Sequence, residues 1–275
     1  MQKEESLEMQ PLVSVVIPVY NDGVYLAESL NSALSQTYAN LEVIIVNDGS
    51  TDSFTLSVLE NIKFPNVRVI HKENGHLSSA RNAGIAIANG EYILTLDADD
   101  RFDKRFVQLA LPCMKEDNVG VVTCFVKSFG DKSYKWKPRG GGVNSFILRN
   151  ECCGNSLFRK SIWKQVGGYD ENMKLGYEDW EFWIRVTKTG WNVKVIDQYL
   201  FNYRISSKSM MLSSSEPNRK EIVKYIAKKH GELYTDYFID SISKWTLVDK
   251  RKVPRWYDIL DLLRRKFQLP YRKQK

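Results

Sequence analysis

Strand-like and helix-like patterns alternate over the first hundred residues, and this alternation constrains the fold more than any other feature of the chain. Four short runs rich in β-branched and aliphatic residues indicate buried strands: Val13–Val19, Leu41–Val46, Val67–Ile70 and Tyr92–Leu96. Residues 24–35 and Leu77–Ala88 carry apolar side chains at helical spacing. Strands that alternate with helices of this length predict an α/β fold with a mostly parallel central sheet and helices on both faces.

The positive charge of the chain is concentrated at its C-terminus. Residues 250–275 hold ten Lys or Arg against two Asp, a net charge of +8, whereas the whole chain carries +7. The rest of the chain is therefore close to neutral. A nucleic-acid enzyme would line its active groove with positive charge, so this distribution argues against that class.

The cysteines and the apolar runs bear on the compartment. The four cysteines, Cys113, Cys124, Cys152 and Cys153, have no zinc-type spacing, and we expect them to be reduced thiols. The N-terminus is polar and has no signal-peptide pattern, and no run approaches the roughly 20 apolar residues that a membrane span needs. These features predict a cytoplasmic protein.

Acidic residues follow two of the predicted strands. Asn47–Asp52 follows the second strand and Asp97–Asp100 follows the fourth. Because the carboxyl ends of parallel strands meet at one edge of a sheet, both loops should lie at that edge. Closely packed carboxylates repel one another unless a cation neutralises them, so the edge is a candidate site for a hard divalent cation. Alternatively, Asp52 caps the helix that follows, and Asp99 and Asp100 only shape their loop.

Five segments together resemble family 2 glycosyltransferases of the GT-A fold. In the order of that family, they are Val13–Asp22, Leu41–Asp52, Ala80–Ile85, Tyr92–Asp100 and Gly167–Arg185. The resemblance covers about residues 13–204. It implies a nucleotide-binding half at about 11–100 and an acceptor half at about 101–217, which make up one domain over 1–217. Residues 218–275 would then form a helical, basic extension.

The resemblance implies roles for the donor-side residues. Asp48 matches the aspartate that reads the base, and a carboxylate can accept the N3 proton of uracil or thymine. Arg81 would be a cation near the diphosphate, although an ion pair on the surface of its helix is the alternative. Asp97 would approach the ribose or the metal, and Asp99 would hold Mg²⁺ or Mn²⁺ across the phosphates. The residues expected along the nucleoside are Pro18, Val19, Tyr20 and Asn21.

The acceptor hydroxyl needs a general base on the side of the anomeric carbon opposite the diphosphate, so this base must lie outside the metal cluster. Asp179 matches the family's base. Residues 178–189 are predicted to form a helix whose dipole would keep Asp179 ionised and slightly lower its basicity. Glu178 is either an acceptor contact or a first-turn acid, and Tyr177 and Trp180 could offer ring faces to a sugar.

One amphipathic pattern lies in the basic tail. Between Pro254 and Phe267, apolar residues form one helical stripe beside Arg and Lys side chains. Such a helix either lies on an anionic membrane, which would place the protein peripherally on the inner face of that membrane, or packs against the catalytic domain.

The resemblance implies an enzyme of the hexosyl or N-acetylhexosaminyl transferase class that acts in polysaccharide biosynthesis. It would transfer a sugar from a nucleoside diphosphate sugar to a hydroxyl of a glycan or lipid-linked saccharide. The base is open between uridine, thymidine and guanosine, and Asp48 favours uridine. A single candidate base predicts inversion at the anomeric carbon. Processive members carry Gln-x-x-Arg-Trp, whereas Arg255-Trp256 lacks the Gln, so a single addition is expected.

Two other classes are compatible with the predicted fold. A sugar-nucleotide nucleotidyltransferase would need a glycine-rich phosphate loop after the first strand, and Pro18–Asn21 is not one. A non-catalytic nucleotide-binding protein would need no general base, whereas this chain has a candidate in Asp179.

Overall fold

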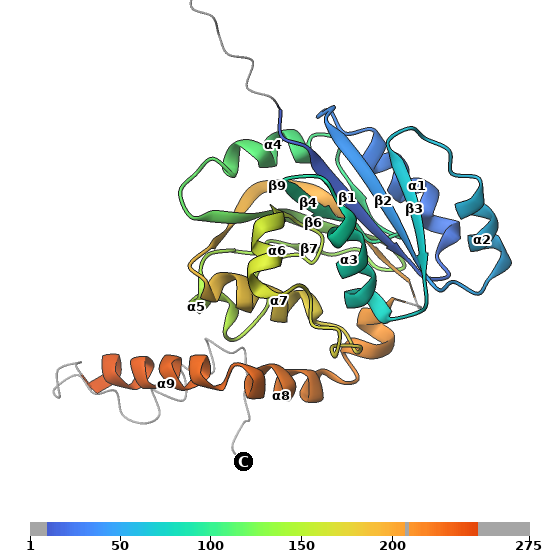
Figure 1. Cartoon of the computed structure of the whole chain (residues 1–275). Helices are drawn as coiled ribbons and strands as arrows, with labels where there is room; N and C mark the ends of the chain where they lie inside the picture. The colour runs from blue at the N-terminus through green and yellow to red at the C-terminus, as the bar shows by residue number, and fades with distance from the viewer. Residues whose placement is uncertain (1–9, 207–208, 247–275) are drawn as a thin grey trace, which may run out of the picture. The chain divides into compact units, whose positions relative to one another are not determined.

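The computed structural model describes residues 10–206 and 209–246 (Figure 1). The strands are β1 (Val13–Val19), β2 (Leu41–Asp48), β3 (Val67–Lys72), β4 (Tyr92–Thr95), β5 (Arg101–Phe102), β6 (Val119–Gly130), β7 (Lys135–Trp136), β8 (Leu157–Arg159) and β9 (Asn192–Ile205). The α-helices are α1 (Gly23–Leu34), α2 (Ser53–Glu60), α3 (His76–Ile87), α4 (Phe106–Cys113), α5 (Val143–Phe146), α6 (Lys160–Val166), α7 (Glu178–Lys188), α8 (Arg219–Lys229) and α9 (Gly231–Thr246). A short π-helix spans Met211–Ser215.

The strands of the described chain form one sheet in the order β3-β2-β1-β4-β8-β6-β9-β5, with β7 paired to β6. The first four strands pair in parallel, as the alternating pattern predicts. Antiparallel pairs of β8 with β4 and with β6 then make the sheet mixed. These later pairings join strands that are far apart in the sequence, so no local sequence pattern predicted them.

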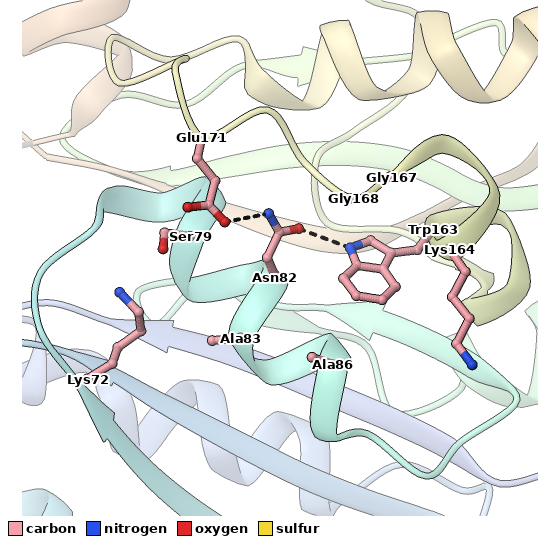
Figure 2. Close-up of a pocket in the computed structure, with 10 residues that line it drawn as sticks. All are labelled: Lys72, Ser79, Asn82, Ala83, Ala86, Trp163, Lys164, Gly167, Gly168 and Glu171. Atoms are coloured by element: carbon pink, nitrogen blue, oxygen red, sulfur yellow. Dashed lines mark hydrogen bonds between the residues drawn. The ribbon is translucent and has the colours of Figure 1, made fainter.

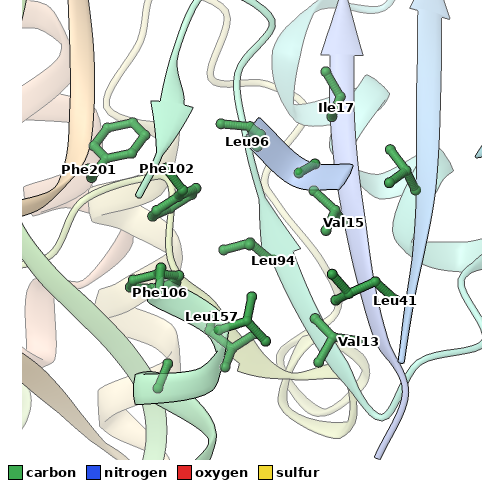
Figure 3. Close-up of a cluster of buried hydrophobic side chains, with 14 of the residues drawn as sticks. Val13, Val15, Ile17, Leu41, Leu94, Leu96, Phe102, Phe106, Leu157 and Phe201 are labelled. Atoms are coloured by element: carbon green, nitrogen blue, oxygen red, sulfur yellow. The ribbon is translucent and has the colours of Figure 1, made fainter. Parts of the chain in front are cut away.

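Alternate side chains of β1 supply the cores on the two faces of the sheet. Val13, Val15 and Ile17 belong to a cluster that also contains Leu26 and Leu30 of α1 (Figure 3 shows part of this cluster). The opposite face packs against α3.

Glycine brings α3 unusually close to the sheet. A Cβ atom at Gly84 would lie 2.5 Å from Val16 Cγ1 and 2.9 Å from Val46 Cγ2. Because both valines are fully buried in strands, the helix can reach this depth only without a side chain at residue 84.

The parallel register brings the polar loops to one sheet edge. Val19 of β1 pairs with Asn47 of β2, and Val16 pairs with Thr95 of β4. Asp48, the last residue of β2, and Asp97, two residues after β4, therefore lie at the same sheet edge on the two strands that flank β1, as predicted. The predicted cap at Asp52 is confirmed as well, because its side chain accepts a hydrogen bond from the Thr55 amide at 2.8 Å.

The chain divides into two compact units, one up to Ile226 and one from Ala227 onward. Within the second unit, α9 exposes Phe238, Ile239 and Ile242. None of the helices in the described ranges is both long and apolar enough to cross a membrane. The predicted amphipathic helix at residues 254–267 lies outside the described residues.

Candidate active site

The side chain of Asp48, at the end of β2, is buried and accepts hydrogen bonds from a lysine and from a backbone amide. Its Oδ1 accepts hydrogen bonds from Lys72 Nζ at 2.8 Å and from the Gly75 amide at 3.0 Å. The side chain of Asp48 is only 4% exposed, so its charge is balanced by Lys72 rather than by water. Both hydrogen bonds to the side chain end on Oδ1, and among the described residues none donates to Oδ2.

The loop after β1 brings the predicted nucleoside residues to the same edge. Pro18 and Val19 are buried in the strand end, whereas Tyr20 is 48% exposed. Asn21 has a positive φ of 56°, which Asn tolerates better than most residues. Its Oδ1 accepts the amides of Thr51 at 2.7 Å and Asp52 at 3.1 Å. The side chain of Asn21 therefore ties two loops together, and Tyr20 offers the open ring.

Asp97 and Asp100 share one partner from a distant segment. Asn155 Nδ2 donates to Asp97 Oδ2 at 3.1 Å and to Asp100 Oδ2 at 3.3 Å, while its Oδ1 accepts the Asp97 amide at 2.8 Å. Asp100 Oδ1 also accepts the Arg204 amide of β9 at 2.7 Å. Residues Asp97–Asp100, which we call the acidic loop, are thus held in a fixed shape by β9 and by Asn155.

The buried carboxylates of the acidic loop repel one another. Burial, together with the charges of Asp97 and Asp22, raises the pKa of Asp99 to about 7. Burial and the charge of Asp99 raise the pKa of Asp100 well above its usual value. The loop therefore disfavours a full set of ionised carboxylates unless positive charge arrives.

Arg81 links the acidic loop to the start of α7. Its Nη2 donates to Asp97 Oδ1 at 2.8 Å and its Nη1 to Glu178 Oε1 at 2.6 Å, and the residue is 1% exposed. Burial alone lowers the pKa of Arg81, but the charges of Asp97 and Glu178 outweigh burial and hold this pKa above its ordinary value. The alternative of a surface ion pair on its own helix is wrong. Both terminal nitrogens are engaged, so Arg81 is a buried bridge and not an open cation.

Asp179 lies beside this bridge, in the first turn of α7. Its Oδ2 accepts a hydrogen bond from Asn150 Nδ2 at 2.8 Å, and a Cβ atom at Gly154 would lie 3.2 Å from the same oxygen. Asn155, which binds the acidic loop, is the next residue, so Asp179 and Asp97 border the same short segment.

The expected lowering of the basicity of Asp179 is wrong. Burial and the neighbouring charge of Glu178 raise its pKa to about 7. The helix dipole, which would lower the pKa, is the weaker influence here. A carboxylate that titrates near neutral pH is well suited to take up a proton.

The other residues predicted on the acceptor side, Glu178, Trp180 and Tyr177, differ in burial and in their contacts. Glu178 is buried and paired with Arg81, which makes it neither a simple cap nor an open contact. Trp180 is 5% exposed and donates from Nε1 to the Phe146 carbonyl, so its predicted role as a sugar-facing ring is corrected to a core role. Tyr177 remains partly accessible, and its hydroxyl donates to Glu216 Oε1 at 2.6 Å.

The acidic loop fits a divalent cation that binds together with a phosphate ligand. Within residues 10–206 and 209–246, no group of three or more His, Cys, Asp and Glu side chains is arranged to hold a metal ion. Both oxygens of Asp97 already accept hydrogen bonds, which leaves Asp99 as the main ligand. Mg²⁺ commonly takes only one or two carboxylates and completes its shell with substrate phosphates and water. The oxygen donors present suit such an ion.

A cavity of about 580 Å³ lies elsewhere, between the outer side of α3 and the segment around α6 (Figure 2). Its lining includes Asn82, Trp163 and Glu171, with Lys72 and Lys164 toward its ends. Among the residues that line this cavity, Lys72 is the one that also contacts a carboxylate of the candidate site, Asp48. The carboxylates that could perform chemistry therefore do not line this cavity.

Three residues that shape the site were missed by sequence reasoning: Lys72, Asn150 and Asn155. Lys72 ends a strand and resembles an ordinary surface lysine. Asn150 and Asn155 lie in an irregular segment with no motif of their own, and only long-range pairing brings them to Asp179 and Asp97.

The raised pKa of Asp99 predicts how stability depends on pH. The folded chain binds this proton more tightly than the unfolded chain, so this group's favourable contribution is complete below about pH 4 and is lost as pH rises through about 7. Asp99→Asn should therefore raise the free energy of unfolding by about 2 kcal/mol at pH 8 and have little effect at pH 4. Denaturant titrations at both pH values measure this difference. The exposed control Asp117→Asn should show no such dependence, and an equal effect of Asp99→Asn at both pH values would contradict the prediction.

Comparisons with known proteins agree with this geometry. The model of the family "Glycosyl transferase family 2" matches residues 14–167, more than half of the chain, and "Glycosyltransferase like family 2" matches residues 127–235. The glycosyltransferase GlyG of Streptococcus pneumoniae is 32% identical over 176 residues, which cover 63% of this chain and 53% of that protein. The chain thus spans about half the length of this curated relative.

Two solved structures resemble the fold. Residues 1–349 of S. aureus TarS, in complex with UDP-GlcNAc, match with a TM-score of 0.63 and 22% identity, over 74% of this chain and 61% of that one. The mannosyltransferase PcManGT of Pyrobaculum calidifontis, in complex with GDP-Man and Mn²⁺, matches with a TM-score of 0.57 and 18% identity, over 74% of this chain and 59% of that one. The predicted GT-A fold is confirmed, and with the family match over residues 14–167 the chain belongs to glycosyl transferase family 2.

Proposed function

We propose that this chain is an inverting, metal-dependent glycosyltransferase. It transfers one sugar from a nucleoside diphosphate sugar, preferably a UDP-sugar, to a hydroxyl of a glycan or lipid-linked saccharide. The observation that carries this proposal is the buried Arg81 bridge, which joins Asp97 on the donor side to Glu178, the neighbour of Asp179, on the acceptor side. This bridge supports a division of labour between two groups of carboxylates.

The donor side supports binding of a nucleoside diphosphate. Asp48 has a carboxylate oxygen, Oδ2, that accepts no hydrogen bond from the described residues, and Tyr20 presents an exposed ring. Asp99 offers an oxygen ligand for a phosphate-bound cation, which would displace the proton that the raised pKa of Asp99 favours. The Oδ2 of Asp48 would accept the N3 proton of uracil. UDP-GlcNAc and GDP-Man with Mn²⁺ are the ligands named for TarS and PcManGT, which supports a sugar nucleotide and a divalent ion as ligands of this chain.

The acceptor side supplies the base. Asp179 takes the proton of the acceptor hydroxyl as that oxygen forms its bond to the anomeric carbon and the bond from this carbon to the diphosphate oxygen breaks. The nucleoside diphosphate leaves with the electron pair of the broken bond. A bound Mg²⁺ or Mn²⁺ would offset the negative charge that develops on the departing phosphate. Asn150 holds Asp179 in place, and a single displacement inverts the anomeric configuration.

A donor screen tests the proposal most directly. The protein should show a higher thermal midpoint with UDP-sugars and Mn²⁺ than with either alone, because a ligand that binds only the folded state stabilises it. UDP-, dTDP- and GDP-sugars are compared in parallel, and the UDP series should give the largest shift. If no sugar nucleotide shifts the midpoint with Mg²⁺ or Mn²⁺ present, the proposed function fails.

Two substitutions separate the roles of the carboxylates. Asp179→Asn should lower kcat by about 10³-fold and leave the Kd for UDP within about twofold, because general-base catalysis contributes on that scale. Asp99→Ala should weaken metal-dependent UDP binding by about tenfold.

Calorimetry and turnover assays on both variants give these numbers, with the exposed Asp197→Asn as the control that should match the unsubstituted protein. Equal loss of UDP binding in both variants would remove the division of labour. NMR of the product reports the anomeric configuration, and retention would overturn the single-displacement mechanism.

We propose further that the C-terminal part of the chain contacts an anionic membrane and so brings the enzyme to a lipid-linked acceptor. On α9, the exposed Ile242 lies three positions after Ile239 and four after Phe238, so these side chains share one side of the helix. Residues 250–275 add a net charge of +8. Apolar side chains combined with clustered basic charge favour an anionic lipid surface.

Vesicle co-sedimentation tests this contact. The full chain should bind vesicles that contain phosphatidylserine and phosphatidylcholine more tightly than vesicles of phosphatidylcholine alone, and 0.5 M salt should reduce the binding because exposed charges are screened. Removal of residues 250–275 should lower the bound fraction severalfold. Unchanged binding after this truncation would contradict the proposal.

A further inference from the structure

A tyrosine is held rigidly at the tip of the β6–β7 hairpin. The Ser128 amide donates to the Tyr134 carbonyl at 2.9 Å, and the Tyr134 amide donates to Ser128 Oγ at 2.7 Å. Ser128 is 5% exposed, so this clamp is anchored in the protein interior, whereas the Tyr134 side chain is 39% exposed. An aromatic ring is therefore presented to solvent from a backbone that cannot easily move.

The pairing of the hairpin decides which way the ring points. Val126 pairs with Trp136 and Lys127 with Lys135, which sets Ser128 opposite Tyr134. Paired and alternate residues share a face of a sheet, so Tyr134 is on the face of Trp136, which packs against the core. Lys135 points to the other face, where its Nζ lies 5.3 Å from the ring centre of Tyr199.

The hairpin that carries Tyr134 is joined to the acidic loop through β9. Ser128 pairs with Tyr203 of β9, and the next residue of β9, Arg204, donates its amide to Asp100. Burial and the charges of Cys153 and Asp100 raise the pKa of Tyr134, which agrees with this placement. Cys153 precedes Gly154, the residue that packs against Asp179. The hairpin of Tyr134 and the segment at residues 153–155 are thus both anchored to the acidic loop, the former through Arg204 and the latter through Asn155.

The strand order gives the direction of the substrate. Asp48 ends β2 and Asp97 follows β4, and β8 and β6 come next to β4 across the sheet. A donor whose base lies at Asp48 and whose phosphates lie at Asp99 extends in this direction. Tyr134, on the hairpin that continues from β6, lies beyond the phosphates, on the side where the reacting sugar and the acceptor must meet.

We propose that Tyr134 is the platform against which the acceptor saccharide packs, with the aromatic ring facing the C–H groups of a pyranose. The proposal rests on the proposed function, because the donor path fixes which side is the acceptor side. Trp180 cannot take this role, since it is buried in the core. Tyr134 is a positioning residue, and it determines which acceptor sugars bind and not how fast the proton moves.

The experiment measures the binding of simple sugars to three variants of the full chain. Saturation-transfer NMR, with UDP and Mg²⁺ present, measures the binding of the methyl glycosides of N-acetylglucosamine, galactose, glucose and mannose. Methyl glycosides are chosen because they bring no aromatic ring of their own. Tyr134→Ala removes the ring, Tyr134→Phe keeps it without the hydroxyl, and Phe64→Ala removes a similarly exposed ring that precedes β3, at the opposite edge of the sheet.

Tyr134→Ala should raise the Kd of each glycoside that binds the unsubstituted protein by about tenfold, the scale of one lost ring contact. Tyr134→Phe should stay within about threefold, Phe64→Ala should have no effect, and the Kd for UDP should be unchanged in all three. Equal thermal midpoints show that each variant is folded.

Three results would overturn the platform: unchanged glycoside binding in Tyr134→Ala, a parallel loss of UDP affinity, or no binding of any of these glycosides to the unsubstituted protein. Ring-dependent glycoside binding by a protein that binds no nucleotide would instead leave the platform standing and remove the proposed function.

Discussion

The structure of the site depends on one buried guanidinium. Arg81 is nearly inaccessible to solvent, yet it contacts carboxylates on two elements that are distant in sequence, at Asp97 and at Glu178. Burying a single charge is costly, and the cost is met only while both partners are present. Arg81 therefore fixes the positions of both carboxylates. The loop after β4 cannot shift independently of the first turn of α7. This coupling fixes the acidic loop relative to Asp179 more firmly than either loop could alone.

The position of Arg81 is in turn set by how α3 packs. Gly84 lets the helix lie directly on Val16 and Val46, and this contact fixes the depth of the helix over the sheet. One residue after Arg81, Asn82 accepts the Tyr169 amide at 2.8 Å and donates to the Tyr169 carbonyl at 2.9 Å. One helix thus connects the parallel sheet, the segment before α7 and α7 itself. The packing of α3 on the core therefore sets the positions of the charged groups at the sheet edge.

Sequence patterns were enough for the parts of this arrangement that depend on local chemistry. The β-branched and aliphatic runs located β1 to β4, and the 3.6-residue periodicity located α1 and α3. Parallel pairing then required the loops at Asp48 and Asp97 to share an edge. The residues that complete the site could not be located in this way. Asn155 acquires its role only because β8 pairs antiparallel with β4, and Trp180 is buried only because α5 supplies the Phe146 carbonyl. Side-chain burial that results from long-range packing has no signal in the local sequence.

The same limit applies to acid strength, and it carries a chemical consequence. The position of Asp179 at a helix start suggested a lowered pKa, but burial next to Glu178 dominates and raises it to about 7. Burial also raises the pKa of Asp99 to about 7, together with the charges of a different set of neighbours, Asp97 and Asp22. A cation that binds Asp99 competes with the proton there, so its binding would be coupled to proton release near neutral pH. Asp179 owes its raised pKa to burial and to Glu178, and the fixed positive charge of Arg81 stands between Asp97 and Glu178. The two carboxylates with raised pKa values, Asp99 and Asp179, therefore each lie beside one of the two acids that Arg81 pairs with, Asp97 and Glu178.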